Sequence, residues 1–137
     1  MTVTREYYFE DIEVGKVLET PAITITEAHV AMFTGLSEVR VSEPHAVQDL
    51  LPLCLSSGLG WRIPQPPTVI LAFMGFDWSF MKPVRVGDTI RSSSRTVAKR
   101  LIKEGGVVIE DRRILNQRGE IIQAGKLTLL VARRPAE

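Results

Sequence analysis

The sequence has one cysteine, almost no net charge and no long apolar run. With Cys54 as its only cysteine, the chain can form neither an internal disulfide nor a thiol cluster for a metal. We therefore expect no metal and a reducing compartment, the cytoplasm.

The charged residues of the chain almost balance. Its 17 Lys and Arg against 16 Asp and Glu give a net charge of +1, whereas nucleic-acid-binding domains usually show a clear basic excess. No apolar run approaches the roughly 18 residues of a membrane helix, and the acidic, aromatic start MTVTREYYFEDIE lacks the apolar region of a signal peptide. We therefore expect neither a nucleic acid nor a membrane as partner.

The length and composition indicate one globular domain over residues 1–137. A domain typically has roughly 100–200 residues, and this chain has 137, of which 45% are hydrophobic and 24% charged. A chain of this size can build a sufficient core without a disulfide or a metal.

The second half of the sequence predicts three antiparallel strands. We expect them at Thr89–Leu101, Val107–Leu115 and Glu120–Ala132. They are separated by Gly105-Gly106 and by a loop containing Asn116 and Gly119, and such short loops indicate hairpins. Along the middle strand, charged residues (Glu110, Arg112 and Arg113) interleave with Ile109 and Ile114, which indicates one wet face and one buried face.

The first half predicts a strand and three helices. We expect the strand at Lys16–Thr24 and a helix at Ala28–Leu36, with Thr26 capping its free N–H groups. A short helix is expected at Leu50–Leu55. The segment Thr68–Phe76 is apolar on every side, which suits either a helix buried all round or a buried strand. Because the prolines before Thr68 suit the start of a helix, we expect a central helix there, with the sheet wrapped around it.

Several motifs resemble the MaoC-like dehydratase family of (R)-specific enoyl-CoA hydratases, which has the hot-dog fold. Tyr8–Gly15 is similar to the family's opening F-x-D-x-x-x-G, and Phe80–Ile90 is similar to F-x-x-P-V-R-x-G-D-T-L. Further similarities are Thr24–Glu27 with Phe33, Pro66–Thr68 at the expected central helix, and the hairpin Asn116–Glu120. The resemblance covers nearly the whole chain.

The resemblance implies an α+β hot-dog fold, an antiparallel sheet wrapped around a central buried helix. It also implies a homodimer, or a heterodimer with another hot-dog subunit, because hot-dog sheets commonly pair edge to edge. An exposed sheet edge does need a cover, which pairing supplies. The implied partner is an acyl-CoA or acyl-carrier-protein thioester, as in fatty acid metabolism, and no cofactor is implied.

The family's catalytic motif, Asp-x-Asn-Pro-x-His, is incomplete in this chain. The corresponding stretch runs from Arg40 to His45. His45 matches the family histidine, whereas Arg40 stands in the place of the aspartate and Ser42 in that of the asparagine. Glu38 and Glu43 are the nearby carboxylates. We therefore expect His45 and Glu43 as catalytic candidates, and Arg40 and Ser42 as substrate contacts.

The expected start of the central helix differs from the family as well. Many family members have Pro-Gly there, and the glycine N–H faces the thioester oxygen. Here Pro67 has no N–H, and Thr68 N–H remains available. The resemblance therefore implies Pro67 and Thr68 as further substrate contacts.

The sequence leaves three functions open. The first is a hydro-lyase that adds water to a 2-enoyl thioester or removes it from a 3-hydroxyacyl thioester, impaired by the loss of the family aspartate. The second is a non-catalytic acyl-thioester-binding subunit that works with a catalytic partner. The third is a thioesterase, for which Asp77 is the candidate carboxylate.

Overall fold

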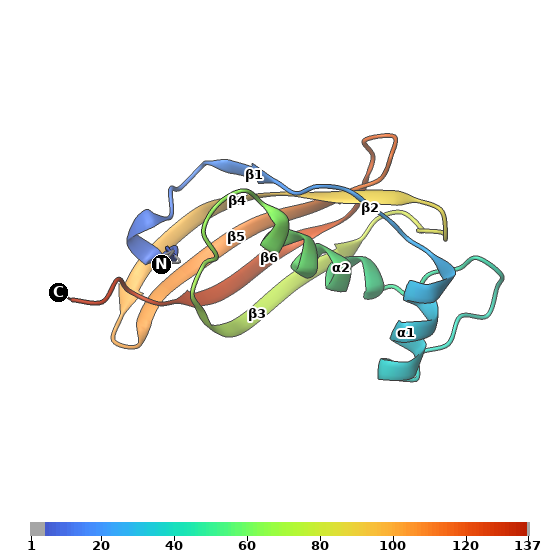
Figure 1. Cartoon of the computed structure of the whole chain (residues 1–137), viewed down its shortest axis with the longest axis horizontal. Helices are drawn as coiled ribbons and strands as arrows, with labels where there is room; N and C mark the ends of the chain where they lie inside the picture. The colour runs from blue at the N-terminus through green and yellow to red at the C-terminus, as the bar shows by residue number, and fades with distance from the viewer. Residues whose placement is uncertain (1–4, 137) are drawn as a thin grey trace.

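The computed structural model describes residues 5–136, and it is built from one antiparallel sheet and two short α-helices. Figure 1 shows the helices lying on one side of a long sheet, with both chain ends at the same end of the molecule. In chain order the elements are η1 (Phe9–Asp11), β1 (Val17–Glu19), β2 (Ile23–Thr24), α1 (Glu27–Ser37), α2 (Leu51–Leu59), η2 (Gly60–Arg62), β3 (Ile70–Phe80), β4 (Thr89–Ile102), β5 (Gly105–Leu115) and β6 (Ile121–Val131). No helix within residues 5–136 has both the length and the apolar character needed to cross a membrane.

The strands pair in the order β1-β4-β5-β6-β3, and β2 pairs separately with β4. The three predicted strands of the second half are confirmed as β4, β5 and β6, which form two consecutive antiparallel hairpins. The predicted strand at Lys16–Thr24 is present as two pieces, β1 and β2, interrupted at Thr20-Pro21. α1 begins after Thr26, whose side chain accepts a hydrogen bond from His29 N–H, as the cap predicted.

The prediction of a central helix at Thr68–Phe76 is wrong. That segment enters β3, and the helix that packs against the sheet is α2, which begins where the short helix was expected and extends to Leu59. The apolar run of β3 is rich in aromatic and β-branched residues, which favour a strand. Two prolines suit the residues just before a strand as well as the first turn of a helix.

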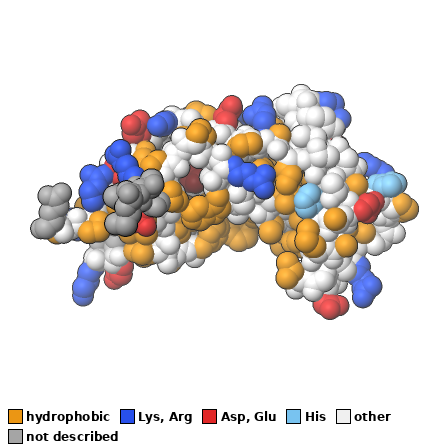
Figure 2. Space-filling model, viewed as in Figure 1, with side chains coloured by type: hydrophobic (Ala, Val, Ile, Leu, Met, Phe, Trp, Pro, Cys, Tyr) orange, Lys and Arg blue, Asp and Glu red, His pale blue; other side chains and the backbone are white. Residues whose placement is uncertain are grey.

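β3 is an edge strand with exposed apolar side chains. It pairs only with β6. More than half of the residue surface is exposed at Leu71 (54%), Phe73 (53%) and Phe76 (53%). Figure 2 shows hydrophobic side chains gathered along the lower side of the molecule, where Figure 1 places β3. Large exposed apolar patches usually mark interaction sites, so this edge is the part of the sheet that most needs a cover.

Two separate hydrophobic clusters hold the helices and the chain ends against the sheet. The larger one joins α1 and α2 to the sheet and contains Ile25, Val30, Leu51, Val84, Ile90, Ile114 and Ile122. The smaller one joins η1 to β5 and β6 and contains Phe9, Val108, Leu129 and Val131.

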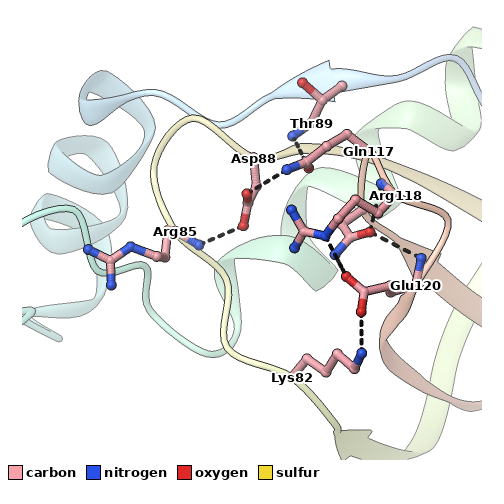
Figure 3. A network of polar contacts seen from close by, with 8 residues as sticks. Lys82, Arg85, Asp88, Thr89, Gln117, Arg118 and Glu120 are labelled. Atoms are coloured by element: carbon pink, nitrogen blue, oxygen red, sulfur yellow. Dashed lines mark hydrogen bonds and ion pairs between the residues drawn. The ribbon is translucent and has the colours of Figure 1, made fainter.

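A polar network ties the loop before β4 to the β5–β6 turn (Figure 3). Glu120 accepts hydrogen bonds from Lys82, Asn116 and Arg118. These bonds lower the pKa of the Glu120 carboxyl from 4.5 to about 2, with Lys82 the largest cause. Gln117 donates to Asp88 in the same network. Because Glu120 stays ionised at neutral pH, the network fixes the hairpin against the loop that leads into β4.

Candidate functional site

A cavity of about 350 Å³ lies between α2 and the sheet. Its walls come from the N-terminal segment, β1, α2, η2, the loop before β3, the first residue of β3, and the strands β4, β5 and β6. Side chains of the smaller hydrophobic cluster, Val108, Leu129 and Val131, make one end of it apolar. Small-molecule sites typically occupy about 300–1,000 Å³ and combine apolar walls with a few polar groups. This cavity is therefore the candidate binding site.

The sheet supplies a polar floor to this cavity. Alternate residues of β4, namely Ser92, Ser94 and Thr96, line it, as do Glu110 and Arg112 of β5. Ser94 lies opposite Arg112, and Thr96 lies opposite Glu110. Side chains two residues apart on a strand point to the same face, which is why these groups gather beneath α2.

The strand alternation had indicated a wet face for Glu110 and Arg112, but both lie on the cavity side of β5. Their side chains are only 16% and 14% exposed, and Arg112 Nε lies 2.7 Å from Glu110 Oε1. Arg112 Nη1 also donates to Ser56 Oγ of α2, at 3.4 Å. Sequence reasoning missed these residues as site members because it placed the covering helix at Thr68–Phe76 and ended the short helix at Leu55, before Ser56, so the packing of α2 over Glu110 and Arg112 was not predicted.

Two of the predicted substrate contacts, Pro67 and Thr68, line the cavity. They lie in the loop between η2 and β3, and this loop is fixed to the N-terminal segment. Pro67 C=O accepts a hydrogen bond from Tyr7 N–H at 2.9 Å, and Tyr7 bridges to Thr68.

His45 lies elsewhere, in the loop between α1 and α2, and it is paired with a carboxylate. Its Nδ1 lies 3.1 Å from Glu27 Oε1, and the two side chains are 63% and 66% exposed. Since a carboxylate only accepts, His45 Nδ1–H donates to Glu27, which leaves Nε2 as an acceptor. Glu27 is the first residue of α1.

The backbone of His45 is held in an unusual conformation. Its φ is +64°, one of two positive values among the non-glycine residues of 5–136. Such conformations cost about 1–3 kcal/mol and tend to occur at functional sites. The carbonyl of His45 accepts from Val86 N–H at 2.8 Å, so the loop is fixed to the segment before β4.

The other predicted site residues of this loop are exposed. Arg40, Ser42 and Glu43 lie between α1 and His45, and none of the three lines the cavity. Asp77, the carboxylate considered for a thioesterase, is exposed on β3 and also lies outside the cavity lining. Within residues 5–136, His, Cys, Asp and Glu side chains form no group of three that could hold a metal ion.

No protein-family model matches this chain, and no curated protein matches it. Solved structures do match it. A monoamine oxidase regulatory protein from Archaeoglobus fulgidus superposes with a TM-score of 0.85 at 27% identity, over 98% of this chain and 100% of that one. An (R)-hydratase from A. caviae involved in PHA biosynthesis superposes with a TM-score of 0.71 at 26% identity, over 91% of this chain and 99% of that one.

A third solved structure has the same fold. The MaoC-like dehydratase from Rhodospirillum rubrum superposes with a TM-score of 0.78 at 20% identity, over 95% of this chain and 99% of that one. The chain has the hot-dog fold that MaoC-like dehydratases and (R)-hydratases share.

Proposed function

We propose that this protein is a hydro-lyase that interconverts a 2-enoyl and a 3-hydroxyacyl thioester, carried on coenzyme A or on an acyl-carrier protein. The observation that carries the proposal is the Glu27–His45 pair, in which a carboxylate orients an imidazole. Positioned acid–base groups of this kind are what hydration of a double bond needs.

The chemistry assigns a role to each member of the pair. His45 Nε2 accepts a proton from water as its oxygen bonds to the β-carbon, and the imidazolium that forms then gives a proton to the α-carbon, which restores the neutral histidine. Glu27 stabilises the imidazolium that forms, as carboxylates do in other histidine-based sites. Dehydration is the same sequence in reverse. Glu43 is the alternative carboxylate, and Arg40 and Ser42 are candidate thioester contacts on the same loop.

The acyl group is assigned to the cavity beneath α2. The apolar end formed by Val108, Leu129 and Val131 suits a hydrocarbon chain, because burying apolar surface is favourable by about 25 cal/mol per Å². Pro67 and Thr68 would contact this group at the cavity wall. A reducing compartment such as the cytoplasm suits a chain whose single cysteine, Cys54, is unpaired.

A second candidate function is acyl-thioester binding without catalysis, in partnership with a catalytic hot-dog subunit. One observation favours it: His45 does not line the cavity. In a single protomer, the acid–base pair and the acyl site are thus separate.

We further propose that the protein assembles through β3, with a second copy of this chain as the partner. β3 offers unpaired backbone groups at a sheet edge, and exposed Phe73, Met74 and Phe76 beside them. Edge pairing would satisfy the hydrogen-bonding groups and cover the apolar side chains together.

The experiment that separates the two functions is incubation of the purified protein with crotonyl-CoA. A hydro-lyase converts it to 3-hydroxybutyryl-CoA, which is followed as loss of the enoyl thioester absorbance and identified by mass spectrometry. Tight binding of crotonyl-CoA without conversion would support the binding subunit instead. Release of free coenzyme A would indicate a thioesterase and contradict both.

A further inference from the structure

The Glu110–Arg112 pair in the cavity floor points to a preference among acyl groups. We propose that Arg112 donates a hydrogen bond to a neutral hydroxyl or carbonyl oxygen carried along the acyl chain, away from the carbons that react. The proposal rests on the proposed function, since it assumes that the cavity holds an acyl group.

The pair is costly as a purely structural feature. Both side chains are more than four-fifths buried, and removing charges from water costs several kcal/mol per ion. Well-packed apolar residues in place of a buried ion pair are often as stable or more stable. Apolar side chains at both positions would also extend the apolar wall begun by Val108 and Leu129. Stability therefore gives little reason for an ion pair here, whereas ligand recognition does.

Arg112 lines the cavity and has N–H groups that the protein's own hydrogen bonds do not use. A guanidinium has five N–H groups. Among residues 5–136, Arg112 uses Nε for Glu110 and one Nη1 N–H for Ser56. Its planar group is held in place by these two bonds, so a ligand oxygen would meet a preorganised donor.

The charges of the cavity favour a neutral ligand oxygen over a carboxylate. The charged side chains of the lining are Glu13, Lys16, Glu110 and Arg112, and their formal charges sum to zero. Glu110 Oε1 already lies 2.7 Å from Arg112 Nε, so a second carboxylate at Arg112 would be repelled by the first. A hydroxyl or carbonyl accepts from Arg112 without this repulsion, and Ser94, opposite Arg112, adds a further polar group.

The oxygen that Arg112 binds differs from the one that reacts. His45 is outside the cavity lining, whereas Arg112 is part of it. The preferred substrate is therefore an acyl thioester with an additional oxygen, beyond the hydroxyl that is added or removed as water.

The test compares acyl-CoA molecules of one size that differ at the chain end. Heptanoyl-CoA ends in a methyl group, 6-hydroxyhexanoyl-CoA in a hydroxyl, and adipoyl-CoA in a carboxylate; dissociation constants are measured by calorimetry, with free coenzyme A as reference. We expect the hydroxyl form to bind about 10–100-fold more tightly than heptanoyl-CoA, the range for a hydrogen bond to a charged group. We expect adipoyl-CoA to bind less tightly than the hydroxyl form.

The variant Glu110→Leu/Arg112→Leu removes the pair together, so that neither charge is left buried alone. It should reverse the preference in favour of heptanoyl-CoA. The control Arg113→Leu, on the exposed face of β5, should keep the wild-type preference. Thermal unfolding confirms that each variant is folded; if the double variant does not fold, Arg112→Gln, which keeps a donor but removes the charge, should reduce the preference.

Three results would overturn the proposal: equal binding of the heptanoyl and hydroxyl forms, tighter binding of adipoyl-CoA than of the hydroxyl form, or an unchanged preference in the folded variant. After any of these three results, the proposed function would still stand if the acyl-CoA molecules bind more tightly than free coenzyme A. If no acyl-CoA binds more tightly than coenzyme A itself, the proposed function fails, and this inference with it.

Discussion

Replacing His45 with alanine is expected to lower the rate of crotonyl-CoA hydration by about 10²–10⁴-fold, the usual contribution of a positioned acid–base group. We expect kcat to decrease much more than KM changes, because in the proposed mechanism His45 transfers the proton whereas the cavity binds the acyl group. The measurement is steady-state kinetics of enoyl thioester loss.

The chain offers a matched control for this variant. His29, the only other histidine, is half-buried on α1, where its Nδ1 accepts a hydrogen bond from Thr26 N–H. His29→Ala should therefore leave hydration near the wild-type rate. Glu27→Gln should lower the rate as well, because the carboxylate that orients the imidazole is lost. Equal rates for wild type and His45→Ala would remove His45 from the mechanism and turn attention to Glu43.

Introducing charge on β3 is expected to separate the assembled protein into monomers. Phe73 and Phe76, whose rings stack edge to face at 5.9 Å, are about half exposed in the protomer. Burying a phenylalanine side chain is worth about 1.5–3 kcal/mol, so Phe73→Asp/Phe76→Asp should raise the dissociation constant by about 10²-fold or more. Light scattering at micromolar concentration measures the change of mass.

The control for assembly is an equally exposed apolar residue away from β3. Leu101, at the end of β4, is 50% exposed, and Leu101→Asp should keep the wild-type mass. A wild-type protein that is monomeric at micromolar concentration would contradict assembly through this edge. So would a double variant that keeps the mass of the wild type while its β-sheet circular dichroism is unchanged.

The strands of the second half could be predicted because their signals are local. Gly105 and Gly119 have positive φ values at the two hairpin turns, and glycine adopts these without a steric penalty. The apolar and polar residues between the turns keep the two-residue period of a strand. Such features need no knowledge of distant contacts.

β3 could not be predicted by the same reasoning. Its apolar run indicates a segment buried on every side, and together with the prolines before Thr68 this pattern favours a central helix. In the protomer that run is instead exposed, at Phe73 as at its neighbours. A surface that a partner covers gives the same sequence signal as a core, so composition alone cannot tell the two apart.

The residues of the candidate site could also be predicted only in part from the sequence. The sequence directed attention to carboxylates near His45 along the chain, Glu38 and Glu43, whereas the carboxylate in contact with it is Glu27, which lies 18 residues before it in sequence. The cavity floor combines Ser56 of α2 with Glu110 and Arg112 of β5. Their proximity follows from the packing of α2 on the sheet, which no local pattern specifies.

The most direct test of the central claim asks whether the acyl group enters the cavity beneath α2. Calorimetry would compare crotonyl-CoA and free coenzyme A on the wild type and two variants of β4. Ser94 lines the cavity and Ser93 does not, since neighbouring strand residues point to opposite faces. Ser94→Phe should fill the cavity and abolish the preference for crotonyl-CoA over coenzyme A, and Ser93→Phe should keep it. A folded Ser94→Phe protein that binds crotonyl-CoA as the wild type does would show that the acyl group lies elsewhere.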